Sequence, residues 1–272
     1  MKITFYGARG SFPVCNPNVI EFGGNTSCIL IETLDGTKII IDAGTGIRKL
    51  GNVLIKDKNP QDIFLLLTHF HWDHIQGWPF FLPAYRSRFN ITIVSLDEKR
   101  GSEKTRALLS GQMTKDYWPV TMDQMNANIN FVEWSTINPL VGELELNSIS
   151  LNHQGGCRGL KIKDSNGKVA TFIIDHEHGE SIDPKYIDFC KGTDILVHDA
   201  QYTNEELNKF VGWGHSTFSQ AIELAQLANA GQLIMTHHDP EHSDEFLSNE
   251  ETKCQQRLNN CLLAKEGMSI EI

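Results

Sequence analysis

The sequence predicts an α/β protein in which two β-sheets pack face to face and helices cover their outer faces, a four-layer αββα sandwich. Short apolar runs of strand length recur along the chain, and helical stretches follow strand runs in both halves. The 272 residues are 40% hydrophobic and 21% charged, which is typical of a globular chain with a sizeable core. We expect residues 1–272 to form a single domain.

The first half contains strand runs joined by turn signals. These runs are residues 2–6, 27–32, 37–42, 63–67 and 91–95. The triplet Leu34-Asp35-Gly36 predicts a hairpin between the second and third runs. A short helix is expected at 47–54, directly after a Gly-Thr-Gly segment that ends the third run.

Residues 83–130 differ in character from the runs around them. They mix aromatic and basic residues with methionine, and they include a helical stretch at 102–112. We interpret this segment as a helical or irregular insertion over one face of the sandwich, a lid or an oligomer contact.

The second half repeats the same organisation. Its strand runs are residues 129–134, 144–151, 159–163, 169–174, 195–198 and 233–236. Asn166-Gly167 is a strong hairpin signal. Apolar residues at helical spacing predict a helix at 219–229, capped by Thr217 or Ser219, and a closing helix is expected at 250–265.

Composition argues against several classes of protein. A net charge of −10 disfavours a protein that holds nucleic acid through a basic surface. The sequence contains no run of 18 apolar residues, so no membrane span is expected, and the N-terminus lacks the features of a signal peptide. The six cysteines form no CxxC pair, so reduced thiols and a cytoplasmic location are expected.

The eleven histidines are not scattered, because many of them directly follow a strand run. The residues found at these run ends are His69, His71, His153, Asp175, His176, His198, Asp199 and His237. Strand ends meet at the edges of sheets, so these groups are expected to converge at one rim. For a single histidine, an ordinary turn residue would be the better interpretation; the repeated pattern favours a metal site.

The stretch HFHWDH carries the strongest signal. His69 and His71 are two apart, so they lie on one side of an extended segment and can share a metal ion. Asp73 and His74 lie where the chain turns into a helix and point elsewhere, so two ions fit the stretch better than one. Trp72 is expected to pack between the two pairs. Imidazole and carboxylate ligands suit Zn²⁺, Fe²⁺ or Mn²⁺.

The same stretch resembles the HxHxDH signature of the metallo-β-lactamase fold superfamily, and further motifs resemble it along nearly the whole chain. Asp42, in IIIDAGTG, resembles the aspartate that supports the metal loop. The resemblance implies one ion held by His69, His71 and His153, and a second held by Asp73, His74 and His237, with Asp175 bridging both. His238 is the alternative to His237.

Two divalent ions, Zn²⁺ first with Mn²⁺ or Fe²⁺ as alternatives, would supply a metal-bridging hydroxide as nucleophile. The segments VHDAQYTNEE and GWGHST resemble a motif pair of the ribonuclease Z and phosphodiesterase branch. This implies a catalytic pair of Asp199 and His215, with Asp73 orienting the nucleophile. The alternative is that His215 only belongs to the start of the helix at 219–229.

The substrate is the least constrained inference. GARGSFP and GGNTSC also resemble this branch, which makes Arg9 a candidate phosphate contact; Arg158 and His176 are further candidates. His176 and His178 would otherwise support the metal site or be only polar residues of the rim. The chain lacks the basic arm of ribonuclease Z proteins, so a small or cyclic phosphodiester is the leading expectation.

The alternatives are a carboxylic ester, lactone or lactam hydrolase, a ribonuclease Z-like nuclease, and a non-catalytic sensor. The complete ligand set argues against the sensor. No stable nucleic-acid partner and no membrane are expected, and the resemblance allows a homodimer.

Overall fold

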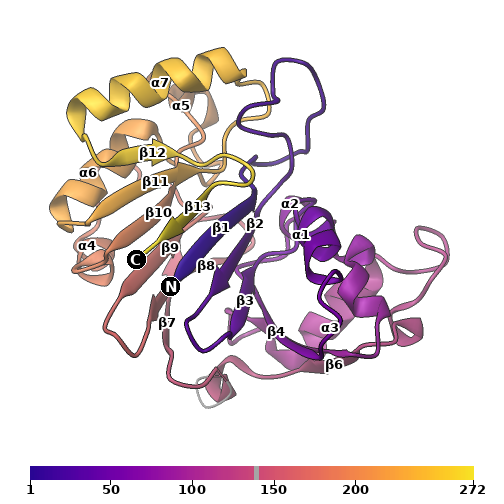
Figure 1. Cartoon of the computed structure of the whole chain (residues 1–272). Coiled ribbons are helices and arrows are strands. Elements are labelled where there is room, and N and C mark those ends of the chain that lie inside the picture. The colour runs from indigo at the N-terminus through magenta and orange to yellow at the C-terminus, as the bar shows by residue number, and fades with distance from the viewer. Residues whose placement is uncertain (138–140) are drawn as a thin grey trace.

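The computed structural model describes residues 1–137 and 141–272, whose strands form two sheets (Figure 1). The strands of the first sheet are β1 (Lys2–Gly7), β2 (Cys28–Glu32), β3 (Lys38–Ile41), β4 (Gln61–Leu67), β5 (Phe89–Ser95), β6 (Asn128–Phe131) and β13 (Ser269–Glu271), in the order β13-β1-β2-β3-β4-β5-β6. Those of the second are β7 (Glu145–Leu151), β8 (Cys157–Lys163), β9 (Val169–Ile173), β10 (Ile195–Asp199), β11 (Gln232–Thr236) and β12 (Cys261–Leu263), in the order β12-β11-β10-β9-β8-β7.

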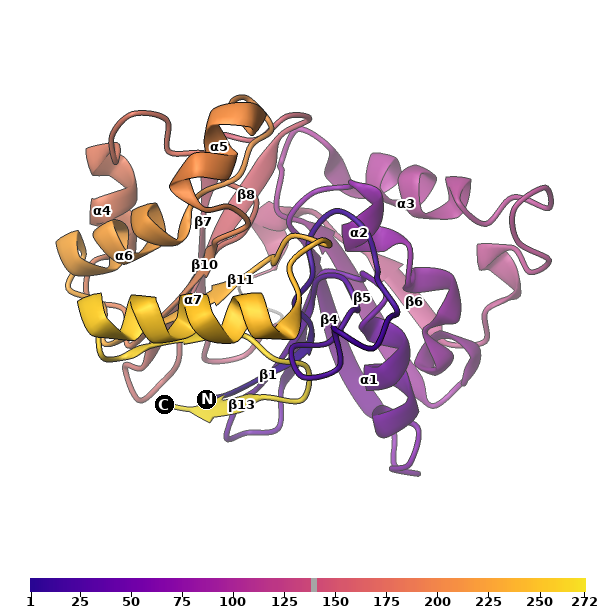
Figure 2. The ribbon, with the colours of Figure 1, turned by 90° about the horizontal axis from the view of Figure 1, so that it is seen from above.

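Helices cover the two outer faces, on opposite sides of the molecule (Figure 2). The α-helices are α1 (Ile47–Leu54), α2 (Trp72–Ile75), α3 (Gly101–Gly111), α4 (Pro184–Cys190), α5 (Asn204–Phe210), α6 (Phe218–Leu227) and α7 (Asp244–Arg257). The 3-10 helices are Trp78–Phe80, Leu82–Tyr85, Met122–Gln124 and Trp134–Thr136. Buried residues of α1 and α3 pack on the first sheet, and those of α4, α6 and α7 pack on the second.

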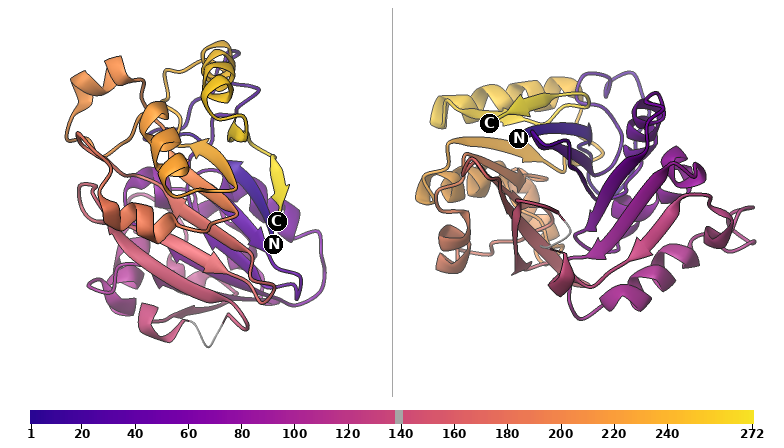
Figure 3. Two further views of the ribbon diagram at one scale, coloured as in Figure 1. Left: turned by 90° about the vertical axis from the view of Figure 1, so that its left-hand side faces the viewer. Right: turned by 60° about the horizontal axis from the view of Figure 1, so that its bottom comes forward.

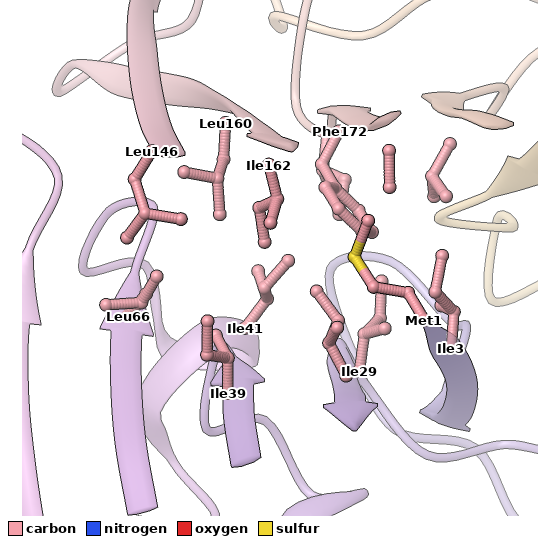
Figure 4. Packing of buried hydrophobic residues seen from close by; sticks show 14 of the residues in the cluster. Met1, Ile3, Ile29, Ile39, Ile41, Leu66, Leu146, Leu160, Ile162 and Phe172 are labelled. Carbon is pink, nitrogen blue, oxygen red and sulfur yellow. The ribbon is translucent and has the colours of Figure 1, made fainter. Parts of the chain in front are cut away.

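The two sheets enclose an aliphatic core. Leu146, Leu160, Ile162 and Phe172 face side chains of the first sheet, among them Ile41 (Figure 4). Alternating side chains of β8 therefore point into this core, and the others point toward the helices, as expected for strands covered on both faces. The sandwich has the four layers that the sequence predicts, and the right-hand view of Figure 3 shows the two sheets between their helices.

Both sheets contain a parallel part whose strands end at the same edge. β3, β4, β5 and β6 are mutually parallel, as are β9, β10, β11 and β12. In open α/β sheets, ligands bind beyond the carboxyl ends of such strands. The segments after β3, β4, β7, β9 and β11, together with the end of β10, carry most of the histidines and aspartates that the sequence singles out.

Most predicted elements are present with boundaries within a few residues. The helix at 47–54 has the predicted bounds, and both predicted hairpins form, with Gly36 and Gly167 at positive φ. Thr217, and not Ser219, caps α6. Residues 83–130 include β5 and most of β6, two strands of the first sheet, and most of their helical and irregular part lies between these strands.

The prediction of a closing helix at 250–265 is wrong in its bounds. α7 begins at Asp244, where the Ser243 side chain accepts a hydrogen bond from the Phe246 amide, and it ends at Arg257. Cys261 and Leu263 are fully buried in β12, which pairs in parallel with β11. The C-terminal strand β13 pairs with β1, which brings the two chain termini together (Figure 1). Among the described residues, no helix is long and apolar enough to span a membrane.

Candidate metal centre

The loop between β4 and α2 places four candidate ligands at the edge of the first sheet. His69 is buried just beyond the strand, and His71 is exposed in the extended position that precedes α2. Asp73 and His74 lie within α2 and are buried. The change from extended chain to helix separates the two pairs, as the sequence predicts.

Asp175, after β9, lies between the two groups of histidines. Its Oδ2 is 3.5 Å from His69 Nε2 and 3.4 Å from His153 Nε2. Its Oδ1 is 3.3 Å from His74 Nε2 and 3.1 Å from His237 Nε2. Each carboxylate oxygen therefore faces one group of imidazoles, which is the arrangement of a bridging ligand.

The remaining contacts complete two clusters. His71 Nδ1 lies 3.0 Å from His153 Nε2 in the first. In the second, Asp73 Oδ2 lies 3.3 Å from His74 Nε2 and 3.2 Å from His237 Nε2. Within each cluster, Asp175 included, the candidate ligand atoms all lie within 4.8 Å of one another. The structure thus brings together all seven residues of the predicted ligand set.

The outer nitrogens of three of these histidines bind acceptors. Nδ1 of His74 is 2.7 Å from Asp42 Oδ2, Nδ1 of His153 is 2.9 Å from the Gly214 carbonyl oxygen, and Nδ1 of His237 is 2.9 Å from Gln201 Oε1. A proton on Nδ1 leaves the Nε2 lone pair free to bind a metal, and this arrangement recurs around metal-bound histidines.

The inner atoms of the two clusters fit divalent cations. His69 Nε2, His74 Nε2 and Asp175 Oδ1 are buried and have no hydrogen-bond partner within residues 1–137 and 141–272. Buried polar atoms without partners are rare, and metal ions bound in the two clusters would satisfy all three. Burial also lowers the pKa of His69 and of His153, which favours the neutral form that binds metals.

The backbone is strained at several of these positions. In the described parts of the chain, the non-glycine residues with positive φ are Ser11, Asp42, Asp175, Asn229 and His237. Ser11 donates its amide to Asp73 Oδ2, so all of them except Asn229 belong to the cluster or contact it. Such conformations each cost on the order of 1–3 kcal/mol and persist where the surrounding structure imposes them, often at functional sites.

Asp42 holds the segment between β4 and α2 through hydrogen bonds. Its carboxylate accepts hydrogen bonds from the Thr68 amide and hydroxyl, both at 2.8 Å, in addition to His74 Nδ1. All three partners are buried. Asp42 therefore fixes both the start of the loop and the orientation of one candidate ligand.

We expect Asp42→Asn to lower the free energy of unfolding of the metal-free protein by about 3 kcal/mol, because a buried carboxylate would lose charge-assisted hydrogen bonds. Thr68→Val, which removes only the hydroxyl donor, should lower it by about 1–2 kcal/mol. Urea unfolding without metal measures both values. Equal effects of the two substitutions would contradict this role of Asp42.

A carboxylate–imidazole pair adjoins the second cluster. Asp199 Oδ2 is 2.7 Å from His215 Nδ1, and Asp199 Oδ1 accepts hydrogen bonds from the amides of Gln201 and Ser216. The His215 ring stacks on His237 at 4.9 Å between centroids. Burial alone would lower the pKa of His215, but the Asp199 carboxylate outweighs it and raises this pKa to about 9. This pKa favours the protonated form of His215 at neutral pH in the metal-free protein.

The structure contradicts two of the predicted substrate contacts. Arg9 is 0% exposed, and its guanidinium donates to the carbonyl oxygens of Gly23, Asp239 and His242. It holds loops together and is not available to a phosphate. His176 is likewise fully buried, with both ring nitrogens in hydrogen bonds to protein groups. The third candidate, Arg158, donates to the hydroxyls of Ser148 and Ser150 across the β7–β8 pair.

Two further points are settled by geometry. His238 points away from the cluster, with Nε2 bound to the Ala264 carbonyl oxygen, while His237 points into it. Trp72 does not pack between the ligand pairs, since 80% of its surface is exposed. The turn into α2, and not the tryptophan, separates the pairs.

Sequence reasoning missed two residues that hold the candidate ligands. Gln201 accepts the hydrogen bond from His237, and the Glu177 carboxylate accepts the amides of Gly212 and Gly214, which fixes the loop whose carbonyl binds His153. Both lie in motifs that the sequence singles out, VHDAQ and FIIDHE. The available signal was their position, two residues after Asp175 for Glu177 and two residues after Asp199 for Gln201.

Comparisons with known proteins agree with this geometry. The family model described as "Beta-lactamase superfamily domain" matches residues 37–238. Ribonuclease Z of Archaeoglobus fulgidus is 27% identical, over 100% of this chain and 97% of that protein. A metallo-beta-lactamase fold protein, YhfI from Bacillus subtilis, superimposes with a TM-score of 0.70 at 19% identity, over 100% of this chain and 98% of that one. A structure titled as a new diphosphatase from the PhnP family gives 0.70 at 18% identity, over 100% and 97%.

Proposed function

The chain is a metallo-hydrolase of the beta-lactamase superfamily, and we propose that it hydrolyses a small or cyclic phosphodiester at a centre of two divalent metal ions. The Asp199–His215 pair carries the proposal. It is a buried imidazole beside the candidate ligands, bonded to a carboxylate that raises its pKa. Hydrolysis of a phosphodiester releases an alkoxide-like oxygen that needs a proton, and this pair can supply it.

We assign His69, His71 and His153 to one ion and Asp73, His74 and His237 to the other, with Asp175 shared between them. When bound, the ions would lower the pKa of a bound water and polarise the phosphoryl group. Zn²⁺ is the first candidate for the ions, with Mn²⁺ and Fe²⁺ as alternatives.

Asp73 and His215 have further roles in the proposed reaction. Asp73, held by the Ser11 amide, would orient the attacking water and accept its proton. His215, whose Nδ1 is bound to Asp199, would use Nε2 to protonate the leaving oxygen or to stabilise charge on the phosphoryl oxygens. We also propose that residues 1–272 act as one domain and that two copies of the chain can form a homodimer.

A substrate panel tests this proposal. Protein loaded with Zn²⁺ or Mn²⁺ is assayed with bis-p-nitrophenyl phosphate, 2′,3′- and 3′,5′-cyclic nucleotides, and a homoserine lactone. We expect turnover of at least one phosphodiester and little turnover of the lactone. Clear lactone turnover with no phosphodiester turnover would reverse the assignment in favour of a carboxylic ester hydrolase.

The pKa of His215 predicts a pH dependence. A general acid acts only while protonated, so kcat/KM should fall as the pH rises through the pKa of His215, which is about 9 in the metal-free protein. Bound cations would lower this pKa, so the fall is expected at or below pH 9. A pH–rate profile from pH 6 to 10 measures this fall in kcat/KM. His215→Asn should abolish the alkaline limb of the profile, in which kcat/KM falls. Persistence of the limb in the variant would assign it to another group.

Exposed aromatic side chains occur in three segments next to the candidate centre. Trp72 (80% exposed) lies between two candidate ligands, Phe12 (66%) follows Ser11, and Trp213 (60%) precedes Gly214. Ser11 and Gly214 each bond to a candidate ligand through the backbone. An exposed tryptophan suits stacking on a flat ring of the substrate, such as a nucleobase, which contributes about 1–3 kcal/mol per base.

We therefore expect Trp72→Ala to raise KM for a cyclic nucleotide by on the order of 10-fold or more, with kcat and metal content little changed. Steady-state kinetics measures the change in KM for a cyclic nucleotide, which has a flat ring, and for a phosphodiester that has no ring. As a control, Tyr117→Ala removes another exposed aromatic residue, in the segment after α3. Equal changes in KM for both substrates would contradict stacking.

RNA is the second candidate substrate, because the relatives include ribonuclease Z. The net charge of −10 disfavours it, since binding of RNA relies largely on cationic contacts with phosphates. A precursor tRNA added to the same panel decides between the two. Cleavage of the RNA with no turnover of small phosphodiesters would favour this alternative.

A further inference from the structure

Three buried histidines, His176, His178 and His198, form a hydrogen-bonded row that begins at the residue after Asp175. His176 Nε2 is 3.1 Å from His178 Nδ1, and His178 Nε2 is 3.0 Å from His198 Nε2. The rings of His178 and His198 are stacked. His176 and His198 are fully buried, and His178 nearly so. The proposed reaction does not use any of the three side chains.

The two ends of the row determine where its protons lie. At one end the Asn152 amide N–H donates to His176 Nδ1, and at the other His198 Nδ1 lies 2.6 Å from the Asp199 carbonyl oxygen, which can only accept. A neutral imidazole has one donor and one acceptor. Protons therefore lie on Nε2 of His176, Nε2 of His178 and Nδ1 of His198, and every link then has one donor and one acceptor.

Neutral rings also agree with the electrostatics. Burial lowers the pKa of all three histidines, to about 2 for His176 and for His178. Both ends of the row are backbone groups, which do not exchange protons with the candidate centre. The row therefore cannot deliver a proton to the reaction, and its role must be to hold structure in place.

The row connects the loops that carry the candidate catalytic groups. Asn152 precedes His153, His176 follows Asp175, and His198 precedes Asp199. Between the two histidines of this segment, Glu177 faces the other way and binds the amides of Gly212 and Gly214. The short segment 175–178 thus contacts the loop at 152–153, the end of β10 at 198–199 and the loop at 212–214.

We propose that His178 is a positioning residue: as the middle of this one-directional row, it sets the spacing of the loops that carry His153, Asp175 and Asp199. Removing its ring would leave a buried donor on His176 and a buried acceptor on His198 without partners. The loops would then relax, and the two clusters and the Asp199–His215 pair would lose their relative placement. The proposal concerns the metal centre and does not depend on which ester is hydrolysed.

Two matched variants test it. His178→Gln has a carbonyl oxygen to accept from His176 and an amide N–H to donate to His198, while His178→Leu has a similar size and neither group. We expect the Leu variant to bind Zn²⁺ about 10-fold or more weakly in a chelator competition. Its kcat should fall by a similar factor, with KM little changed. The Gln variant should stay within about threefold of the unaltered protein in both measurements.

Imidazole ¹⁵N NMR of the Zn²⁺-loaded, unaltered protein tests the proton positions directly. We expect three neutral rings, protonated at Nε2 in His176 and His178 and at Nδ1 in His198. A different tautomer, or a charged ring at neutral pH, would overturn the proposal. So would a Gln variant as impaired as the Leu variant, or a Leu variant that loses only thermal stability. If the Leu variant does not fold, the Gln variant and the NMR spectrum still decide.

These readouts separate two kinds of failure. If no phosphodiester is turned over but Zn²⁺ affinity and tautomers behave as expected, the proposed substrate is wrong and the role of His178 stands. If phosphodiesters are hydrolysed but the tautomers differ, the proposed substrate class stands and the proposed role of His178 is wrong.

Discussion

Asp175→Asn is expected to lower kcat/KM by on the order of 10³-fold and to reduce bound metal to at most one ion per chain. The Asp175 oxygens face different clusters, Oδ2 toward His69 and His153, and Oδ1 toward His74 and His237. An amide keeps one oxygen and replaces the other with an NH₂ group that cannot bind a cation. Losing a metal removes several kcal/mol of transition-state stabilisation, and each 1.36 kcal/mol is about a factor of ten in rate.

Elemental analysis after dialysis, together with steady-state kinetics, measures both effects. Asp164→Asn is a matched control, because Asp164 is another nearly buried aspartate that accepts backbone hydrogen bonds, at the turn between β8 and β9. It should leave metal content unchanged. An Asp175→Asn protein that keeps two ions and full activity would show that Asp175 does not bridge them.

His215→Asn is expected to lower kcat by about 10²–10³-fold for a phosphodiester with a ribose or alkyl leaving group, with metal content unchanged. Such an oxygen is a poor leaving group and needs the proton that His215 holds. A p-nitrophenolate leaves readily without a proton, so bis-p-nitrophenyl phosphate should lose much less activity. Asp199→Asn should reproduce this difference, because Asp199 orients the ring and raises the pKa of His215.

The comparison of the two leaving groups distinguishes two roles of His215, general acid and stabiliser of charge on the phosphoryl group. Equal losses on both substrates would mean that His215 stabilises charge on the phosphoryl group and is not the acid. No loss on either substrate would show that phosphodiester hydrolysis does not need the Asp199–His215 pair, and the pair would then no longer support the proposed function.

The fold was largely predictable because its strands are short apolar runs that end at turn signals. Asn166-Gly167 is an example, since the turn it predicts joins β8 and β9. The C-terminal region was less predictable. The residues after Arg257 continue an apparently helical pattern, but Cys261 and Leu263 complete the edge of the second sheet beside β11. That pairing is a tertiary interaction, which local propensity does not record.

The candidate ligands were predictable because they follow strand ends, either directly or, for Asp73 and His74, in the short helix beyond β4, and parallel strands end at a common edge. The roles of isolated residues were not. Whether Arg9 contacts a ligand or carbonyl oxygens depends on a loop more than 200 residues away, at Asp239 and His242. The link between His178 and His198 likewise exists only after β9 and β10 pair. The exposure of Trp72 follows from the direction of the α2 turn, which the motif alone does not specify.

A metal titration of phosphodiesterase activity tests the central claim most directly. Metal-free protein is titrated with Zn²⁺ or Mn²⁺, and turnover of a phosphodiester that the substrate panel identifies is measured at each step. Two clusters that share Asp175 predict that activity reaches its maximum at two equivalents per chain. Full activity at one equivalent, or phosphodiester turnover without any metal, would contradict a dinuclear phosphodiesterase.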